Sequence, residues 1–164
     1  MNIRKLMLIV VAVLAAGFLL IQLVPYGRAH ENPPVVAEPN WDSPQTRELA
    51  QRACFDCHSN ETTWPWYASV APVSWLVQHD VDEGRNYLNF STWGRGGEGE
   101  EIDDLSRIVL EGKMPPSQFL ITHPEARLTD AEKAALADGL AATAGQSPSG
   151  VGVESGHDSD DDHD

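Results

Sequence analysis

Both cysteines of this 164-residue chain lie in the stretch ACFDCH, where two residues separate Cys54 from Cys57 and His58 follows at once. Such a pair suits half of a zinc site, a redox disulfide or a c-type haem attachment. A zinc site needs four ligands, and the sequence offers no further cysteine and no suitable histidine pair. A thioredoxin-like motif belongs with alternating strands and helices, which the apolar pattern does not show. Haem also explains the histidine, as an axial ligand of the iron. The motif therefore predicts one covalently attached haem c, with a structural disulfide or another metal as the alternative.

Met114 is the candidate for the second axial ligand. It is the only methionine beyond the N-terminal segment, and it lies in GKMPPS, where two prolines exclude a helix and favour an extended loop. A single Met that only fills a gap in the core is the competing interpretation. His79 is the alternative distal ligand, one turn after Trp75 on an expected helix, although it could equally be a solvated surface residue. His123, in a loop before a proline, ranks lower.

Aromatic side chains are numerous enough to line a haem pocket in part. Their positions alone do not separate pocket walls from general core. The candidates are Trp41, Trp64, Trp66, Trp75, Trp93, Tyr67, Tyr87, Phe90 and Phe119.

The N-terminal segment is apolar from Leu6 to Val24 except for Gln22. These residues would form a helix of about 28 Å, close to the thickness of a bilayer's hydrocarbon core. A cleaved secretory signal is the alternative, with Gly27-Arg28-Ala29 as a weak cleavage site. Arg4 and Lys5 precede the segment, so the positive-inside bias predicts a single-pass anchor with everything after residue 24 on the periplasmic or extracytoplasmic side.

Four regions follow from the composition of the chain: an anchor or signal (1–24), a proline-rich linker or arm (25–42), a helical domain (43–145) and an acidic tail (146–164). Ser43-Pro44 predicts a helix start, and Thr129 with Glu132 predicts a capping box. Further helices are expected over 72–83 and 101–111, ended by Gly84 and Gly112, with a flexible glycine-rich loop between them. No segment is predicted as a strand with conviction. The tail, which carries His157 and His163, is expected to be disordered.

The chain is acidic, with a formal net charge of -14. Such a surface repels phosphate backbones, which makes nucleic-acid binding improbable, and it favours a basic protein partner.

The motifs NPPV, ACFDCHSNET-x-WPWY, AP-x-SW, DV-x-EGR-x-x-LNFS-x-W and GKMPP…LTDAEKAAL resemble the bacterial membrane-anchored haem-binding domain family, over roughly residues 24–143. The resemblance implies cytochrome c-like haem binding through Cys54, Cys57 and His58. It supplies no defined physiological reaction.

Together, these features predict an all-α fold: a small cytochrome c-like helical domain around one covalent haem, preceded by a single N-terminal transmembrane helix. Single-electron transfer is the expected function, without enzymatic activity. A haem-based gas sensor or peroxidase-like enzyme with a labile distal ligand is the alternative, and a haem-binding assembly factor is a further one.

Overall fold

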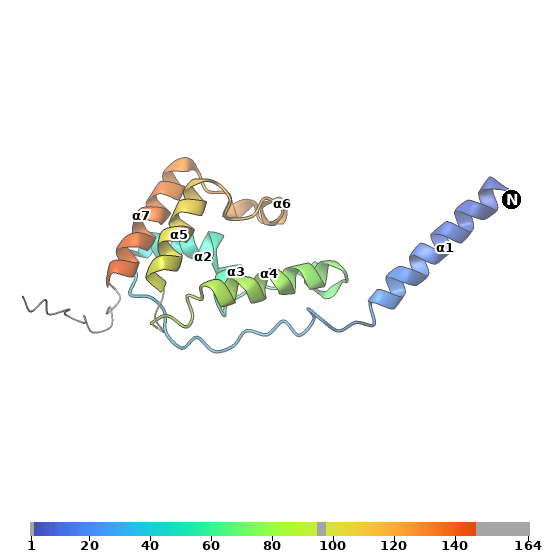
Figure 1. Ribbon diagram of the computed structural model, residues 1–164, viewed down its shortest axis with the longest axis horizontal. Coiled ribbons are helices and arrows are strands. Elements are labelled where there is room, and N and C mark those ends of the chain that lie inside the picture. Colours follow the sequence, from blue (N-terminus) through green and yellow to red (C-terminus); the bar gives the residue numbers. More distant parts are fainter. Residues whose placement is uncertain (1, 95–97, 147–164) are drawn as a thin grey trace, which may run out of the picture.

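The computed structural model describes residues 2–94 and 98–146, and within these ranges the chain is all-helical (Figure 1). The only strand-like pairing there is an isolated parallel bridge between Ala37 and Thr92. The expected all-α class is confirmed. The helical elements, in chain order, are α1 (Ile3–Ile21), α2 (Pro44–Ala53), α3 (Phe55–His58), the 3-10 turn η1 (Trp66–Ser69), α4 (Val73–Tyr87), α5 (Glu98–Leu110), α6 (Phe119–Thr122), the 3-10 turn η2 (Pro124–Ala126) and α7 (Asp130–Gln146).

α1 is long and apolar enough to cross a membrane, and none of its residues is buried in the protein. Its N-terminus is capped by Asn2, whose side chain accepts a hydrogen bond from the backbone N–H of Arg4. The helix ends at Ile21, a few residues before Pro25, whose ring disfavours helical geometry in the residue before it. In Figure 1 it projects away from the other helices.

The helix starts follow the capping signals in the sequence. The Ser43 hydroxyl accepts from the backbone N–H of Thr46 at 3.2 Å, with Pro44 in the first turn of α2. At α7, Thr129 and Glu132 bond reciprocally: Thr129 N–H donates to Glu132 Oε2 at 2.8 Å, and Glu132 N–H donates to Thr129 Oγ1 at 3.2 Å. Both predicted caps are confirmed.

Two expectations about glycine are wrong. Gly84 does not end α4, which continues to Tyr87. This glycine instead lies where α4 contacts the backbone of Cys57 on α3. The glycine-rich stretch is not all loop, since α5 already begins at Glu98. Acidic residues favour the first turn of a helix, which gives a reason for this early start. By contrast, Gly112 has φ +70 just beyond α5, as expected for a helix-ending glycine.

The core forms where α5 packs along α7 and α2 packs against α7 (Figure 1). Ile102, Leu105 and Val109 form the buried face of α5 that the sequence pattern predicts. An aromatic group extends this core, with Phe90 at its centre between Trp41, Phe55 and Trp93. Three of the nine expected pocket aromatics, Trp41, Phe90 and Trp93, therefore belong to the core or pack against it.

The proline-rich segment lies on the domain as an extended arm. Val36 N–H donates to the Ser91 carbonyl at 2.9 Å, and Trp93 N–H donates to the Ala37 carbonyl at 3.0 Å. Glu38 forms a two-point ion pair with Arg47 on α2, with both oxygens at 2.8 Å from the guanidinium. The tail expected to be disordered lies outside the described residues, except for Gln146, which ends α7.

Candidate functional site

A cavity of about 370 Å³ opens beside α3. Its walls come from α3, the second half of α4, one face of α5 and the loop after α5. The cavity brings together Cys54, Cys57, His58 and Met114, four residues that the sequence singles out and that come from distant parts of the chain. Its other lining residues are Ala53, Asp56, Asp80, Glu83, Gly84, Tyr87, Asp104, Leu105, Ile108, Pro115, Pro116 and Phe119.

His58 is held at one ring nitrogen. Its Nδ1 lies 3.1 Å from the carbonyl oxygen of Leu88, and because a carbonyl only accepts, Nδ1 carries the proton. The Phe90 N–H donates back to the His58 carbonyl at 2.8 Å. Burial lowers the pKa of His58, against hydrogen bonds to the backbone of Leu88 and Gly84, which raise it. The neutral ring therefore keeps Nε2 as a free lone-pair donor, the state in which histidine binds a metal.

The two cysteines are free thiols; Cys54 is buried and Cys57 is partly buried. Burial raises the pKa of each to about 12, helped at Cys54 by the neighbouring Cys57 and at Cys57 by the negative charge of Asp80 and Asp56. Reactive dithiols have the opposite shift, towards a stable thiolate. The described part of the chain also has no group of three His, Cys, Asp or Glu residues arranged to hold a metal ion. The raised pKa values do not favour a reactive dithiol, and the described residues offer no zinc ligand set.

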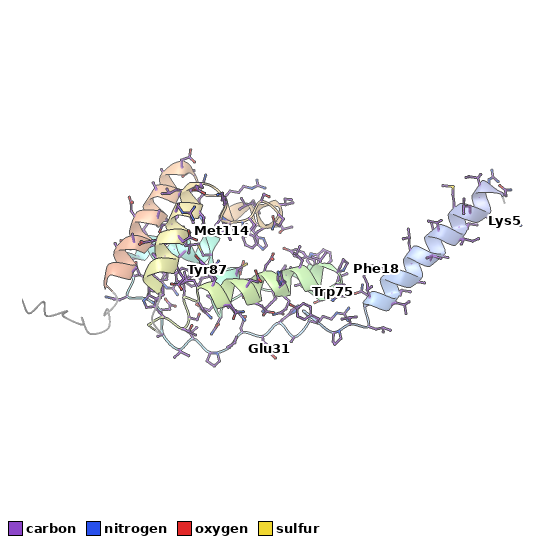
Figure 2. All side chains as sticks on the ribbon, in the orientation of Figure 1. Lys5, Phe18, Glu31, Trp75, Tyr87 and Met114 are labelled. Atoms are coloured by element: carbon purple, nitrogen blue, oxygen red, sulfur yellow. The ribbon has the colours of Figure 1, made fainter. Side chains whose placement is uncertain are left out.

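Met114 lies on the α5 side of the cavity, and Figure 2 labels it near Tyr87 on α4. Its side chain is half-buried and packs against the core. The backbone N–H groups of Lys113 and Met114 both donate to the Ile108 carbonyl, at 2.9 and 3.3 Å, which ties the loop to the end of α5. Pro115 and Pro116 continue the same wall.

The other histidines lie elsewhere. The His79 side chain is 60% exposed, 3.9 Å from Glu83, and does not line the cavity. The His123 ring stacks on Phe119 with centroids 3.9 Å apart and lines a neighbouring, mostly apolar cavity of about 280 Å³ that also touches Cys57. Among the candidate ligands from the distal side, Met114 is the one that shares a cavity with His58.

Gly84 and Arg85 are structural supports of the site that the sequence analysis did not identify. A Cβ on Gly84 would lie 2.4 Å from the Cys57 carbonyl oxygen, so only glycine lets α4 approach α3 this closely. Arg85 Nε donates to the Ser59 carbonyl at 2.8 Å, while its terminal nitrogens reach Glu31 and Asn32 on the arm. The segment EGR in the sequence contains both residues, but nothing local reveals these contacts.

The lining of the cavity is acidic. Asp56, Asp80, Glu83 and Asp104 line it, and none of the described lining residues is Lys or Arg. Burial raises the pKa of both Asp56 and Asp80, while hydrogen bonds from Arg107 and Tyr87 lower the pKa of Asp104. Tyr87 Oη donates to Asp104 at 2.9 Å and so joins α4 to α5 beside the cavity.

An all-helical domain with two thiols, a neutral histidine and a thioether around one cavity has the donor set of a haem-binding protein. The model of the haem-binding domain family matches residues 16–142, most of the chain. The protein therefore belongs to the haem-binding domain family. No curated protein and no solved structure matches the chain.

Proposed function

We propose that the domain holds one haem c covalently and transfers single electrons. The observation that carries this proposal is the placement of Cys54, Cys57, His58 and Met114 around one cavity. Cys54 and Cys57 would each hold the haem through a thioether, formed by addition of the S–H group across a vinyl group. His58 Nε2 and Met114 Sδ would be the two protein ligands of the iron.

Haem supplies an iron that alternates between two oxidation states, and the protein residues set its surroundings. The Leu88 carbonyl orients the His58 ring and increases its basicity as a ligand. A thioether ligand from Met114 would raise the reduction potential relative to a second imidazole. The acidic residues of the cavity would attract a basic redox partner at low ionic strength and slow its binding as salt rises.

We further propose that the domain works outside the cytoplasmic membrane, with α1 retained as its anchor. Arg4 and Lys5 favour a cytoplasmic N-terminus. Cleavage near Ala29 would remove Gln22, which bonds to Ala71 just before α4, and Gly27, which lies against Ser74 in the first turn of α4. These contacts support a retained α1 over a cleaved signal.

The test is the absorption spectrum of the full-length protein, produced with a c-type maturation system, in both oxidation states. A pyridine haemochrome of the two-thioether type, haem that resists acidic acetone, and a near-infrared sulfur-to-iron band are the expected results. A high-spin spectrum that shifts with carbon monoxide would favour the sensor or peroxidase-like alternative, with Met114 unbound. A colourless protein would refute the haem assignment.

A further inference from the structure

The end of α1 is bonded directly to the haem-binding domain. The Gln22 side-chain amide pairs with the backbone of Ala71: Nε2 donates to the Ala71 carbonyl at 2.9 Å, and Oε1 accepts from the Ala71 N–H at 3.0 Å. Arg28 donates to the same Oε1 at 2.9 Å. Because Gln22 follows the last residue of α1, the domain begins where the helix ends, without an intervening free linker.

The residues after Gln22 follow the start of α4 closely. Gly27 is buried with φ +77, and a Cβ there would lie 2.2 Å from the Ser74 carbonyl oxygen. Tyr26 Oη donates to Asp82 on α4 at 3.4 Å. Figure 2 labels Phe18, near the end of α1, and Trp75, at the start of α4, at neighbouring ends of the two helices.

Large apolar side chains are exposed on this side of the domain. Trp66 is 81% exposed and Ile121 75%, and Leu76 and Val73 are exposed to 50% and 41%. These four residues form what we term the apolar face. Its parts are adjacent, because Tyr67 Oη on η1 donates to Thr122 Oγ1 on α6 at 2.9 Å, and Val73, Leu76 and Thr122 line one cavity.

We propose that the apolar face rests on the surface of the same bilayer that α1 crosses. Tryptophan is enriched at the membrane interface, where an apolar ring with a polar N–H is stable. Large apolar side chains exposed on adjacent segments mark an interaction site. The bilayer is the favoured partner because of the bonds between Gln22 and Ala71. They join the end of the apolar helix α1 to the short segment between η1, which contains Trp66, and α4.

This arrangement gives the haem domain a defined orientation to the membrane. The cavity of about 280 Å³ beside the apolar face shares Cys57 and Phe119 with the cavity of about 370 Å³ that contains the candidate haem ligands. The apolar face and the candidate haem site therefore occupy adjoining parts of the domain. The acidic lining of the haem cavity would then lie at a fixed height above the lipid. The inference rests on the proposed membrane insertion of α1.

The experiment uses the full-length, haem-loaded protein in phosphatidylcholine vesicles with or without brominated acyl chains, which quench nearby tryptophan. In a Trp66→Phe background, Ile121→Trp places a reporter on the apolar face, and Val36→Trp is the matched control. Val36 is 69% exposed and lies on the arm, where its N–H bonds to Ser91. Trp41, Trp64, Trp75 and Trp93 remain in both variants, so the difference between the two reports the added tryptophan. We expect brominated lipid to reduce emission of the Ile121→Trp variant more than that of the Val36→Trp variant.

Two readouts separate failure of docking from failure of anchoring. Resistance of the protein to alkaline carbonate extraction reports insertion of α1 independently of any reporter. An inserted protein whose reporter at position 121 is quenched no more than the reporter at 36 would overturn the docking and leave the anchor intact, whereas a protein released by carbonate would overturn both. Gln22→Ala should reduce quenching at position 121 while the protein stays inserted, and unchanged quenching would contradict the role of the Gln22–Ala71 pair.

Discussion

Gly84 on α4 lies against the carbonyl group of Cys57 on α3, so that a Cβ at residue 84 would come within 2.4 Å of the oxygen and 2.9 Å of the carbon. Both atoms belong to the backbone of the Cys-x-x-Cys-His motif, which cannot move without moving the cysteine. The relationship fixes how closely α4 approaches the candidate ligands.

Gly84→Ala should therefore separate α3 from α4. We expect a loss of about 1 to 3 kcal/mol in the free energy of unfolding, as for other overpacked sites, together with a lower yield of haem-loaded protein. Denaturant unfolding and the haem-to-protein absorbance ratio measure the two effects. Gly145→Ala is the control: nothing lies within 4 Å of a Cβ there, so stability should stay the same or rise by up to about 1 kcal/mol. Equal behaviour of both variants would contradict the steric argument.

The role of Gly84 could not be predicted from the sequence. A glycine after an apolar helical pattern is a common helix end, and Gly112 meets that expectation. At residue 84 the glycine is required by a second helix, and no local pattern reports a tertiary contact. The caps at Ser43 and Thr129 were predictable because both partners of each hydrogen bond lie within four residues.

The candidate site likewise has residues that the sequence predicts and contacts that it does not. Cys54, Cys57 and His58 follow from a local motif, and Met114 follows from the scarcity of methionine together with its prolines. The Leu88 carbonyl that orients His58 could not be predicted, because any backbone carbonyl can accept and only the fold brings this one within 3.1 Å. Of Met114 and His79, which sequence spacing alone left as alternatives, Met114 lines the cavity with His58 and His79 does not.

Arg85 should stabilise the segment that follows the Cys-x-x-Cys-His motif by joining it to the arm. Its guanidinium donates to the carbonyl groups of Ser59 and Glu31 and to side-chain oxygens of Asn32 and Thr62. Lysine keeps the charge but lacks the planar guanidinium group that makes these hydrogen bonds at once. Arg85→Lys should therefore lower the free energy of unfolding by about 1 to 3 kcal/mol.

Denaturant unfolding of the full-length protein in detergent tests this, with Arg107→Lys as the control. Arg107 is more than half exposed, and among the described residues it pairs with Asp104 on α5 and with Glu111 just beyond that helix, so Arg107→Lys should cost less than about 1 kcal/mol. The assigned role of Arg85 is wrong if the two variants lose the same amount.

Met114→Ala tests the distal ligand. We expect loss of the near-infrared sulfur-to-iron band and a lower reduction potential, because the proposed thioether ligand, which would stabilise ferrous iron, is removed. Spectroelectrochemistry of the oxidised and reduced protein measures both. Met7→Leu, in α1 and 63% exposed, is the matched control and should leave both quantities unchanged. An unaltered spectrum in Met114→Ala would mean that another group, or none, binds the iron on that side.

Glu132, in the first turn of α7, should make the free energy of unfolding depend on pH. Hydrogen bonds from Thr129 and Arg52 lower the pKa of its carboxyl group to about 2, from an ordinary value of 4.5. A carboxyl group whose pKa is lower in the folded state stabilises the protein above its unfolded pKa and loses that contribution as pH falls towards the folded value. The contribution of Glu132 should therefore be complete above about pH 5 and decline between about pH 4.5 and 2.

Glu132→Gln removes this titration while keeping a side chain that can bond to Thr129. The variant should be less stable than the parent at pH 7, and the difference should shrink as pH falls through that window, measured by urea unfolding at a series of pH values. Asp130→Asn is the control in the same turn, since the Asp130 side chain is fully exposed and bonds only to Lys133 among the described residues. A stability difference for Glu132→Gln that stays constant from pH 7 to pH 2 would show that the carboxylate charge contributes nothing and that the cap acts through shape alone.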